Sequence, residues 1–177
     1  MNEPDPFAPP RRTVHRGRNL AVSAGLVGVA AAAGSLASEP DSPWYRKLDK
    51  PSWQPPSTAF PVVWSTLYSL IAATSVAVLN ELDRRGDVHG AGEYRRALAR
   101  NLVLNGAWSW LFFRAHNLPA ATAGAAALAA NSIRLTGRAG RVGGRFGWAL
   151  APYALWTSFA TVLAGTLWAL NRGRADS

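Results

Sequence analysis

The chain has 177 residues, of which 49% are hydrophobic and 16% charged, and it carries a formal net charge of +9 without any cysteine. This length suits one domain, and the absence of cysteine excludes disulfides, zinc–thiolate sites and thiol nucleophiles. The hydrophobic fraction excludes a chain that is disordered throughout. The basic excess is also a feature of nucleic-acid-binding proteins, so the position of the charges matters.

Five long stretches contain no Asp, Glu, Lys or Arg: residues 19–38, 51–80, 101–113, 115–133 and 146–171. A surface helix of a soluble protein carries charge on its outer face, whereas a bilayer requires about 20 mostly apolar residues per helix. The pattern predicts an all-α integral membrane bundle of five transmembrane helices at residues 19–38, 58–80, 97–115, 118–135 and 146–171, with Arg100 snorkelling to the interface. A soluble bundle with alanine-rich core helices is the alternative.

The segment before the first predicted helix, residues 1–18, holds four prolines and four arginines. Few apolar side chains are available there, so we expect a disordered tail; residues 172–177 form a second, short tail. Arginines followed by an apolar run and by the small residues around Ala37 are also the layout of a secretory signal peptide. Cleavage of the first helix is therefore an alternative to its retention.

A long connection at residues 39–57, here named the capping segment, follows the first helix. It contains Trp44, Tyr45 and Trp53 together with several prolines, among them Pro51. Prolines stiffen the backbone and aromatic rings add apolar area. We interpret this segment as a structured cap over a cavity between helices, and an aromatic belt at the lipid headgroups is the alternative.

The second predicted helix carries Trp64 and Tyr68 four positions apart, so both side chains lie on one face. The third carries a single stripe at steps of four, three and four: Asn101, Asn105, Trp108 and Phe112. An asparagine inside a membrane helix is costly unless its amide finds a partner. The asparagines either join helices or offer a polar group to a ligand, and both interpretations stay open.

The fourth predicted helix is rich in small residues between Ala120 and Ala127, which permits close packing within or between subunits. The fifth carries Trp156, Ala160 and Leu163 on one face. An indole beside an alanine makes a flat wall with free space, which suits a planar apolar ligand. Plain helix packing is the alternative for this stripe.

Residues for conventional catalysis are scarce. His15, His89 and His116 show no metal-ligand spacing, so no metal site is predicted. All ten acidic residues lie outside the uncharged stretches, so no carboxylate within a predicted span serves as a general base. The sequence offers no candidates for acid–base or nucleophilic catalysis.

The basic residues are distributed unevenly across the five-span arrangement. The side holding the N-terminus carries 13 of the 19 basic residues. Positively charged loops favour the cytoplasm, so we expect a cytoplasmic N-terminus and an external C-terminus. The charge then reports topology and contact with membrane lipids, and no nucleic-acid partner is predicted.

Three motifs occur in order along the chain: Trp44-Tyr45-x-x-Leu48-x-Lys50-Pro51-Ser52-Trp53 with Trp64 and Tyr68, then Asn105-x-x-Trp108-Ser109-x-x-Phe112-Phe113, then Pro152-Tyr153-x-x-Trp156-x-x-Phe159-Ala160. Together they resemble the TspO/MBR family, the tryptophan-rich sensory proteins related to the mitochondrial translocator protein. The resemblance extends over most of the chain, from Leu20 to Asn171.

The resemblance implies five membrane helices with the first one retained, assembled as a homodimer, most simply in a bacterial cell membrane. It also implies a pocket that is closed by the capping segment and binds porphyrins such as protoporphyrin IX, with no required cofactor. The residues expected to bind the ligand are Tyr45, Trp64, Asn105, Trp108, Trp156 and Ala160, with Trp44, Pro51 and Trp53 in the cap; Trp108 joins the set through its stripe on the third helix.

Three functions follow as expectations. The first is a tetrapyrrole sensor, carrier or scavenger. The second is light- and oxygen-dependent porphyrin degradation, which the resemblance associates with Trp64 and Trp156. The third is a structural protein that docks lipid or a partner. Animal members carry a cholesterol motif with a tyrosine near the end of the last helix; residues 160–171 contain none, so cholesterol binding is not expected here.

Overall fold

The computed structural model describes residues 14–40 and 42–174, and most of the expected N-terminal tail lies outside them. Its helices are α1 (Arg16–Ala37), α2 (Pro43–Lys47), α3 (Ala59–Arg85), α4 (Val88–Ser109), α5 (Leu118–Val142) and α6 (Gly144–Asn171). A π-helical turn, Trp110–Arg114, continues α4, and a 3₁₀ turn, Arg172–Arg174, follows α6. Over the described range the fold is all-α, as predicted.

The described residues form six α-helices, one more than the five expected membrane helices, because the capping segment contains a helix of its own. The side chain of Ser42 accepts a hydrogen bond from the backbone N–H of Tyr45 over 3.2 Å, and Pro43 starts the helix at the position where a missing N–H costs nothing. At its other end, the Lys50 ammonium donates to the carbonyls of Tyr45 and Leu48 over 2.6 and 3.1 Å. These local contacts explain a helix of only five residues.

The long helices extend beyond the charge-free stretches from which they were predicted. Helix α3 continues to Arg85 and stops at Gly86, which adopts the left-handed conformation with φ 67°. Asp87 then caps α4 by accepting a hydrogen bond from the N–H of Gly90. The helices end at these capping residues. Charged residues can continue a helix, so the end of a charge-free stretch marks where the helix reaches water and not where it stops.

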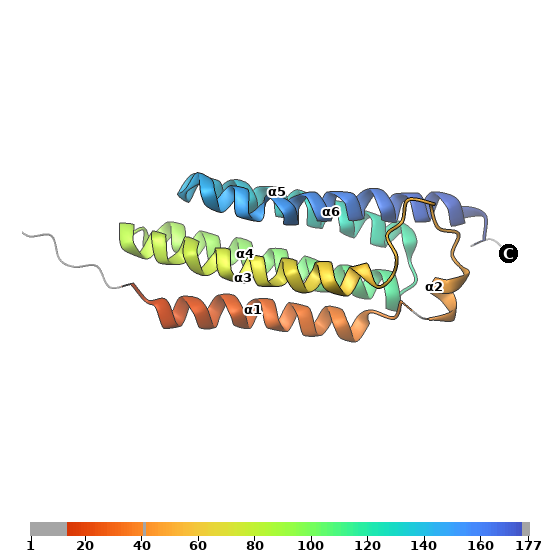
Figure 1. Ribbon diagram of the computed structural model, residues 1–177, viewed down its shortest axis with the longest axis horizontal. Coiled ribbons are helices and arrows are strands. Elements are labelled where there is room, and N and C mark those ends of the chain that lie inside the picture. The colour runs from red at the N-terminus through yellow and green to blue at the C-terminus, as the bar shows by residue number, and fades with distance from the viewer. Residues whose placement is uncertain (1–13, 41, 175–177) are drawn as a thin grey trace, which may run out of the picture.

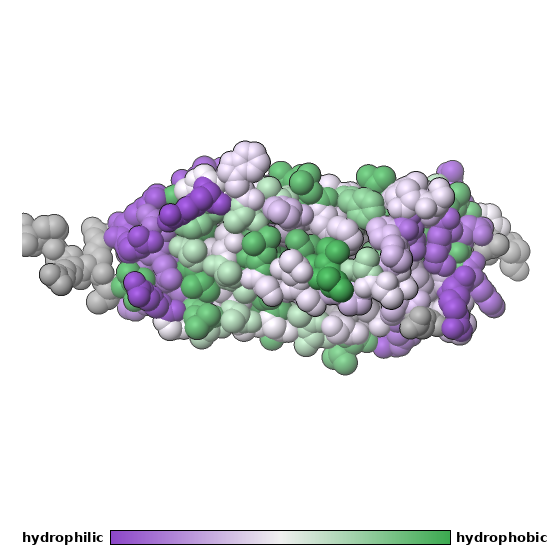
Figure 2. All heavy atoms as spheres, viewed as in Figure 1, coloured by the Kyte–Doolittle hydropathy of each residue, from purple (hydrophilic) through white to green (hydrophobic). Residues whose placement is uncertain are grey.

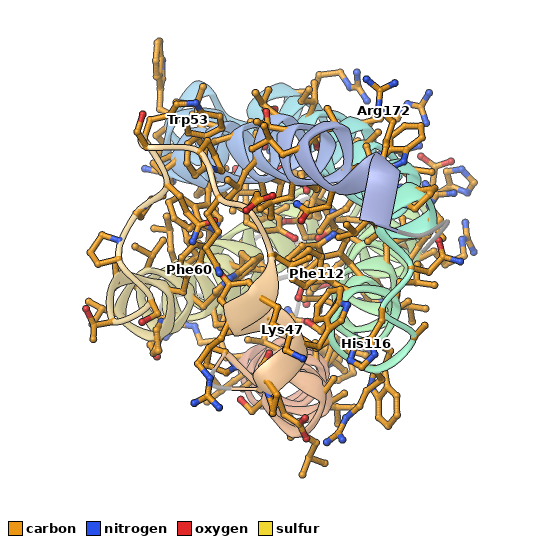
Figure 3. All side chains as sticks on the ribbon, turned by 90° about the vertical axis from the view of Figure 1, so that its right-hand side faces the viewer. Lys47, Trp53, Phe60, Phe112, His116 and Arg172 are labelled. Atoms are coloured by element: carbon orange, nitrogen blue, oxygen red, sulfur yellow. The ribbon has the colours of Figure 1, made fainter. Side chains whose placement is uncertain are left out.

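Five long helices run side by side, and α2 lies across one end of the bundle (Figures 1 and 3). Helix α1 packs on α3 and α4, and α5 packs along α6. The α5–α6 pair starts from a close approach, because a Cβ on Gly147 would lie 3.0 Å from the Cα of Gly140. The core includes the fully buried Ile71, Leu98 and Tyr153.

On the face shown in Figure 2, hydrophobic residues gather along the middle of the bundle and hydrophilic residues at its two ends. Large apolar side chains face outward, for example Val29, Val103 and Leu155, which are about 70% exposed. By length and composition, three helices of the described chain are suited to cross a membrane: α1, α3 and α6. Helices α4 and α5 fall outside this set.

At the end away from α2, a polar cluster joins α1 to α3. The buried side-chain amide of Asn19 donates to Asp83 over 2.9 Å and to Asn80 over 3.0 Å. The backbone N–H of His15 donates to the same Asp83 carboxylate over 3.1 Å, and the Arg18 guanidinium lies 3.7 Å from it. This cluster makes α1 an integral part of the bundle.

Candidate ligand-binding cavity

A cavity of about 280 Å³ lies beneath the capping segment. This volume is close to the lower end of small-molecule sites, about 300–1,000 Å³. The lining comes from α1, α3, α4, α6, the π-helical turn and the capping segment: Gly34, Ser35, Ser38, Pro40, Tyr45, Ser57, Phe60, Pro61, Trp64, Ser65, Tyr68, Asn105, Trp108, Ser109, Phe112, Phe113, Trp156, Phe159, Ala160 and Leu163, with Ala31, Ala164 and Leu167. The bundle thus gathers residues from four of its five long helices around one space.

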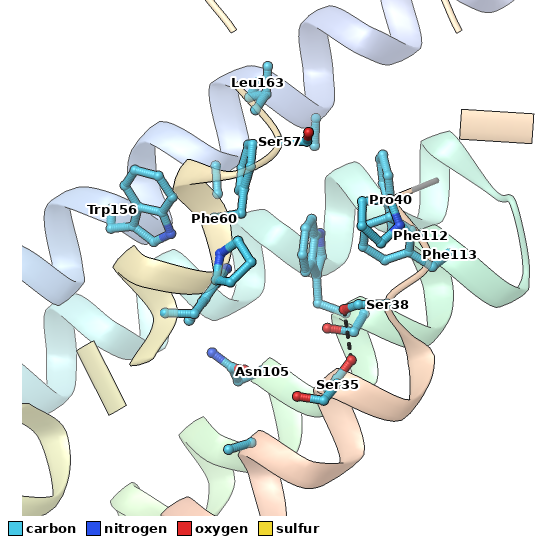
Figure 4. Close-up of a pocket in the computed structure, with 18 of the residues that line it drawn as sticks. Ser35, Ser38, Pro40, Ser57, Phe60, Asn105, Phe112, Phe113, Trp156 and Leu163 are labelled. Atoms are coloured by element: carbon cyan, nitrogen blue, oxygen red, sulfur yellow. Dashed lines mark hydrogen bonds between the residues drawn. The ribbon is translucent and has the colours of Figure 1, made fainter. Parts of the chain in front are cut away.

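Aromatic rings form two facing walls of this cavity. Figure 4 shows Trp156 and Phe60 on one side and Phe112 and Phe113 on the other. The centroids of Phe60 and Trp156 lie 5.9 Å apart, edge to face, and Trp108 stacks on Phe112 at 5.5 Å with 23° between the rings. Rings that pack on one another hold their faces in fixed positions, so each wall presents ordered aromatic surface to the cavity.

The floor of the cavity is polar. The Tyr68 hydroxyl donates to Asn105 Oδ1 over 2.7 Å, and Asn105 Nδ2 donates to the Tyr153 hydroxyl over 3.3 Å. Gly34 of α1 lies beside this pair, and a Cβ there would be in ordinary contact with the Tyr68 oxygen at 3.5 Å. Each Asn105 amide atom therefore has a partner, which removes the cost of burying an unpaired amide.

Two indole N–H groups at the cavity have no acceptor. The Nε1 atoms of Trp108 and Trp156 are buried and make no hydrogen bond within the described residues. A buried donor without a partner costs free energy. Trp108 and Trp156 both line the cavity, so the unpaired donors belong to residues that surround this space.

Tyr45 of α2 closes the cavity from above. Its hydroxyl accepts a hydrogen bond from the Gln54 amide over 3.1 Å, and the Lys50 ammonium lies 4.7 Å from its ring centroid. Burial raises the pKa of Tyr45 above its ordinary value, although the Gln54 hydrogen bond acts in the opposite direction. The phenol therefore stays neutral at physiological pH, and the cap presents no charge from this residue to a ligand.

Three contacts fasten the capping segment and its neighbouring loop. Asn171 pairs with the backbone of Asp49. The Arg114 guanidinium donates to the Leu36 carbonyl over 2.8 Å and lies 2.7 Å from the Glu39 carboxylate. The remaining contact is the stack of Trp44 on the His116 ring, with centroids 4.3 Å apart. Together they tie the ends of α1 and α6 and the α4–α5 connection to the cap.

The structure brings together all six residues expected to bind a ligand: Tyr45, Trp64, Asn105, Trp108, Trp156 and Ala160. None of the three expected cap residues lines the cavity. Trp44 packs on Phe112 and His116 outside the cavity lining, and Trp53, 46% exposed, packs edge-on against Phe159. Pro51 lies outside the lining, where its carbonyl accepts from the Gln54 N–H over 3.0 Å.

Several lining residues were not among those predicted. Phe60 and Tyr68 share a helix face with Trp64, so the same four-residue spacing indicates them. The contribution of α1, chiefly Gly34 and Ser35, has no comparable signal because α1 is a run of small residues without a distinctive stripe.

Catalytic groups remain scarce around this cavity. No group of three or more His, Asp or Glu residues in the described part of the chain is placed to hold a metal ion. The lining contains hydroxyls, one amide, indoles and apolar groups. This composition suits binding, and the indoles are its most oxidisable side chains.

Comparison with known proteins identifies one family. The profile of the TspO/MBR family matches residues 21–169. The chain is 34% identical over 154 residues to tryptophan-rich protein TspO of Chlorobaculum tepidum, covering 86% of this chain and 95% of that protein. It is 36% identical over 140 residues to the translocator protein of Sus scrofa (74% and 76% covered) and 34% identical over 131 residues to the uncharacterized membrane protein YtaB of Bacillus subtilis (74% and 82%).

Proposed function

This chain belongs to the TspO/MBR family of membrane proteins, and we propose that it binds porphyrin-type planar ligands in the cavity beneath the capping segment, as a tetrapyrrole sensor, carrier or scavenger. One observation carries the proposal. Aromatic rings face each other across a cavity whose floor is polar and whose walls hold two unpaired indole donors, on Trp108 and Trp156. A planar macrocycle with peripheral carboxylates matches both features, since its faces stack on rings and its oxygens accept from indoles.

The cavity is not fully enclosed. Ser35 on α1 and Pro61 and Ser65 on α3 line the cavity and are exposed. The cavity therefore reaches the surface between these two helices. A flat ligand can lie between the aromatic walls with one edge in this gap, facing lipid.

We also propose that all five long helices cross the membrane, including α4 and α5. Each has at least 22 residues, which at about 1.5 Å per residue spans the hydrocarbon core. The charge bias then places the N-terminus in the cytoplasm and the capping segment outside. The small-residue face of α5 is the surface on which we expect a homodimer to form.

The experiment is an equilibrium titration of the detergent-purified protein with protoporphyrin IX in the dark, followed by porphyrin absorbance. Trp64→Ala and Trp156→Ala are expected to weaken binding about tenfold, because each removes a ring from the cavity wall. Trp148→Ala is the matched control: Trp148 lies on α6 like Trp156 but is 82% exposed. Equal affinities in all four proteins would contradict the proposal.

The alternative function is light-dependent porphyrin degradation at the same site, favoured by the position of Trp64 and Trp156, which line one cavity. Illumination of the complex in the presence of oxygen distinguishes the two. A new absorbing product whose rate of formation falls in Trp64→Ala and Trp156→Ala, but not in Trp148→Ala, would make the protein an enzyme. Loss of porphyrin no faster than in protein-free detergent would leave binding as its function.

A further inference from the structure

A chain of hydrogen bonds leads from the cavity floor into the core of the bundle. It begins at Tyr68 and Asn105, described above, and passes to the Tyr153 hydroxyl, which donates to Asn101 Oδ1 over 2.7 Å. Asn101 Nδ2 then donates to Ser132 Oγ over 3.0 Å. The Ser132 hydroxyl donates to the backbone carbonyl of Leu128 over 2.8 Å, where the chain ends.

The last bond fixes the direction of all the others. A backbone carbonyl only accepts hydrogen bonds, so the Ser132 hydroxyl hydrogen is used on Leu128 and the Ser132 oxygen must accept from Asn101. Asn101 then presents its oxygen to Tyr153, which uses its own hydrogen there and accepts from Asn105. Asn105 in turn presents its oxygen to Tyr68.

At the cavity, this direction decides which hydrogen-bonding group Tyr68 offers to a ligand. Its single hydroxyl hydrogen is committed to Asn105, and the group that remains for a ligand is an oxygen lone pair. In the opposite direction Ser132 would lose the Leu128 carbonyl, and the Tyr68 hydrogen would be released toward the cavity. The two directions therefore make opposite floors, one that accepts hydrogen bonds and one that donates them.

We propose that this chain holds the Tyr68 hydroxyl at the cavity floor as a hydrogen-bond acceptor, so that of two otherwise matched planar ligands the one whose buried edge carries an N–H or O–H donor binds more tightly, with Ser132, Asn101 and Tyr153 as positioning residues. The inference rests on the proposed function, since it concerns the ligand of the same cavity. Asn101, Ser132 and Tyr153 are each 0% exposed and lie outside the cavity lining. They act on a ligand only through Asn105 and Tyr68.

The test uses two planar probes that differ in one group, phenanthridinone, a flat lactam with a free N–H, and its N-methyl derivative. Wild-type protein is expected to bind the N–H lactam about tenfold more tightly, because the N-methyl compound leaves the Tyr68 oxygen buried and unpaired. Tyr68→Phe should reduce this preference to within about twofold. In Ser132→Ala the hydrogen bonds of the chain are no longer held in one direction. The preference for the N–H lactam should then fall to about threefold, with the cavity lining unchanged.

Ser158→Ala is the matched control for Ser132→Ala. The Ser158 hydroxyl also donates to a carbonyl four residues earlier, that of Ala154 over 2.8 Å, but has no place in the chain. Its preference should stay near tenfold. Tyr153→Phe, which breaks the chain while keeping the ring, is a second variant should Ser132→Ala fold poorly, and it too should lower the preference.

The ratio between the two lactams distinguishes a positioning role from a structural one. If Ser132→Ala and Tyr153→Phe weaken both lactams by the same factor, or wild type binds both equally, the inference is overturned while the proposed function stands. Lactams that fail to bind where protoporphyrin IX binds also overturn it. If neither the lactams nor protoporphyrin IX binds, the proposed function fails as well.

Discussion

Asn171, at the end of α6, pairs through its side-chain amide with both backbone groups of Asp49 in the capping segment. Asn171 Oδ1 accepts from the Asp49 N–H, and its Nδ2 donates to the Asp49 carbonyl, each over 3.0 Å. The residues are 122 positions apart. Asn171 is only 6% exposed, so water does not compete freely for these bonds. The pairing fixes the cap to the helix that carries Trp156.

Asn171→Ala should loosen the capping segment without unfolding the bundle. Because both bonds to Asp49 are lost, we expect amide hydrogen exchange in residues 42–57 to accelerate about tenfold, which corresponds to about 1.4 kcal/mol. Exchange in the core helices should not change. Thr166→Ala, on the same helix with an exposed hydroxyl that bonds only to its own helix, is the control. Unchanged exchange in the Asn171 variant would show that other contacts hold the cap.

Gly34→Ala should weaken ligand binding while leaving the fold intact. The new methyl group would lie 3.5 Å from the Tyr68 oxygen and 3.6 Å from Ser109 Oγ, which is ordinary contact, and it would cover the polar floor. Alanine also favours the helix by about 1 kcal/mol. We expect thermal stability to be kept or raised and porphyrin affinity to fall several-fold.

The control for this variant is Gly28→Ala, since a Cβ at Gly28 meets nothing within 4 Å. It should give the same helix gain with no change in affinity. If both variants bind porphyrin like wild type, the floor beside Gly34 is not part of the binding site.

The site residues could be predicted where two signals agree. Trp64, Trp108 and Trp156 combine a bulky ring with helical spacing, and spacing alone decides which face of a helix a residue occupies. The long capping segment was predicted as a cap for a similar reason, since its prolines and aromatic rings are costly in a flexible linker. Short α2 was missed because one helical turn leaves no periodic pattern.

Other features depend on contacts between distant segments and could not be predicted. The role of Gly34 arises because α1 packs beside Tyr68, and nothing in α1 itself distinguishes Gly34 from Gly28. The hydrogen bond between Tyr153 and Asn101 joins residues that are 52 positions apart and lie on different helices. Sequence spacing indicated that Asn101 needs a partner but not which partner it has.

Asp83→Ala should destabilise the protein more than removal of an exposed carboxylate that also joins two helices. The Asp83 side chain is 8% exposed and accepts from Asn19 and from the His15 backbone. Its loss leaves the Asn19 amide short of one acceptor, which we expect to cost about 1–3 kcal/mol. Glu93→Ala removes the ion pair with Arg138, in which both side chains are more than one third exposed. This variant should change thermal stability little. Equal melting temperatures of the two variants would contradict this ranking.

Substitutions of His116 test the backbone strain at the residue that stacks on Trp44 of the cap. Its φ is 51°, in the left-handed region that disfavours residues with a Cβ, and its ring stacks on Trp44. His116→Ala loses the stack and keeps the strain, whereas His116→Gly loses the stack and relieves the strain. We expect the glycine variant to be more stable than the alanine variant by about 1 kcal/mol. The reverse order, measured by thermal unfolding in one detergent, would show that the backbone at this position is not strained.

The central claim, that a planar ligand occupies the cavity beneath the cap, is tested most directly by the indole ¹⁵N–¹H spectrum of the full chain in detergent, with and without protoporphyrin IX. The chain has eight tryptophans. We predict that saturating porphyrin shifts the signals of Trp64, Trp108 and Trp156, with Trp108 and Trp156 gaining the hydrogen bond they lack. The exposed Trp148 should not move. If porphyrin binding reaches saturation but the indole signals of Trp108 and Trp156 do not shift, while that of Trp148 does, the claim is contradicted.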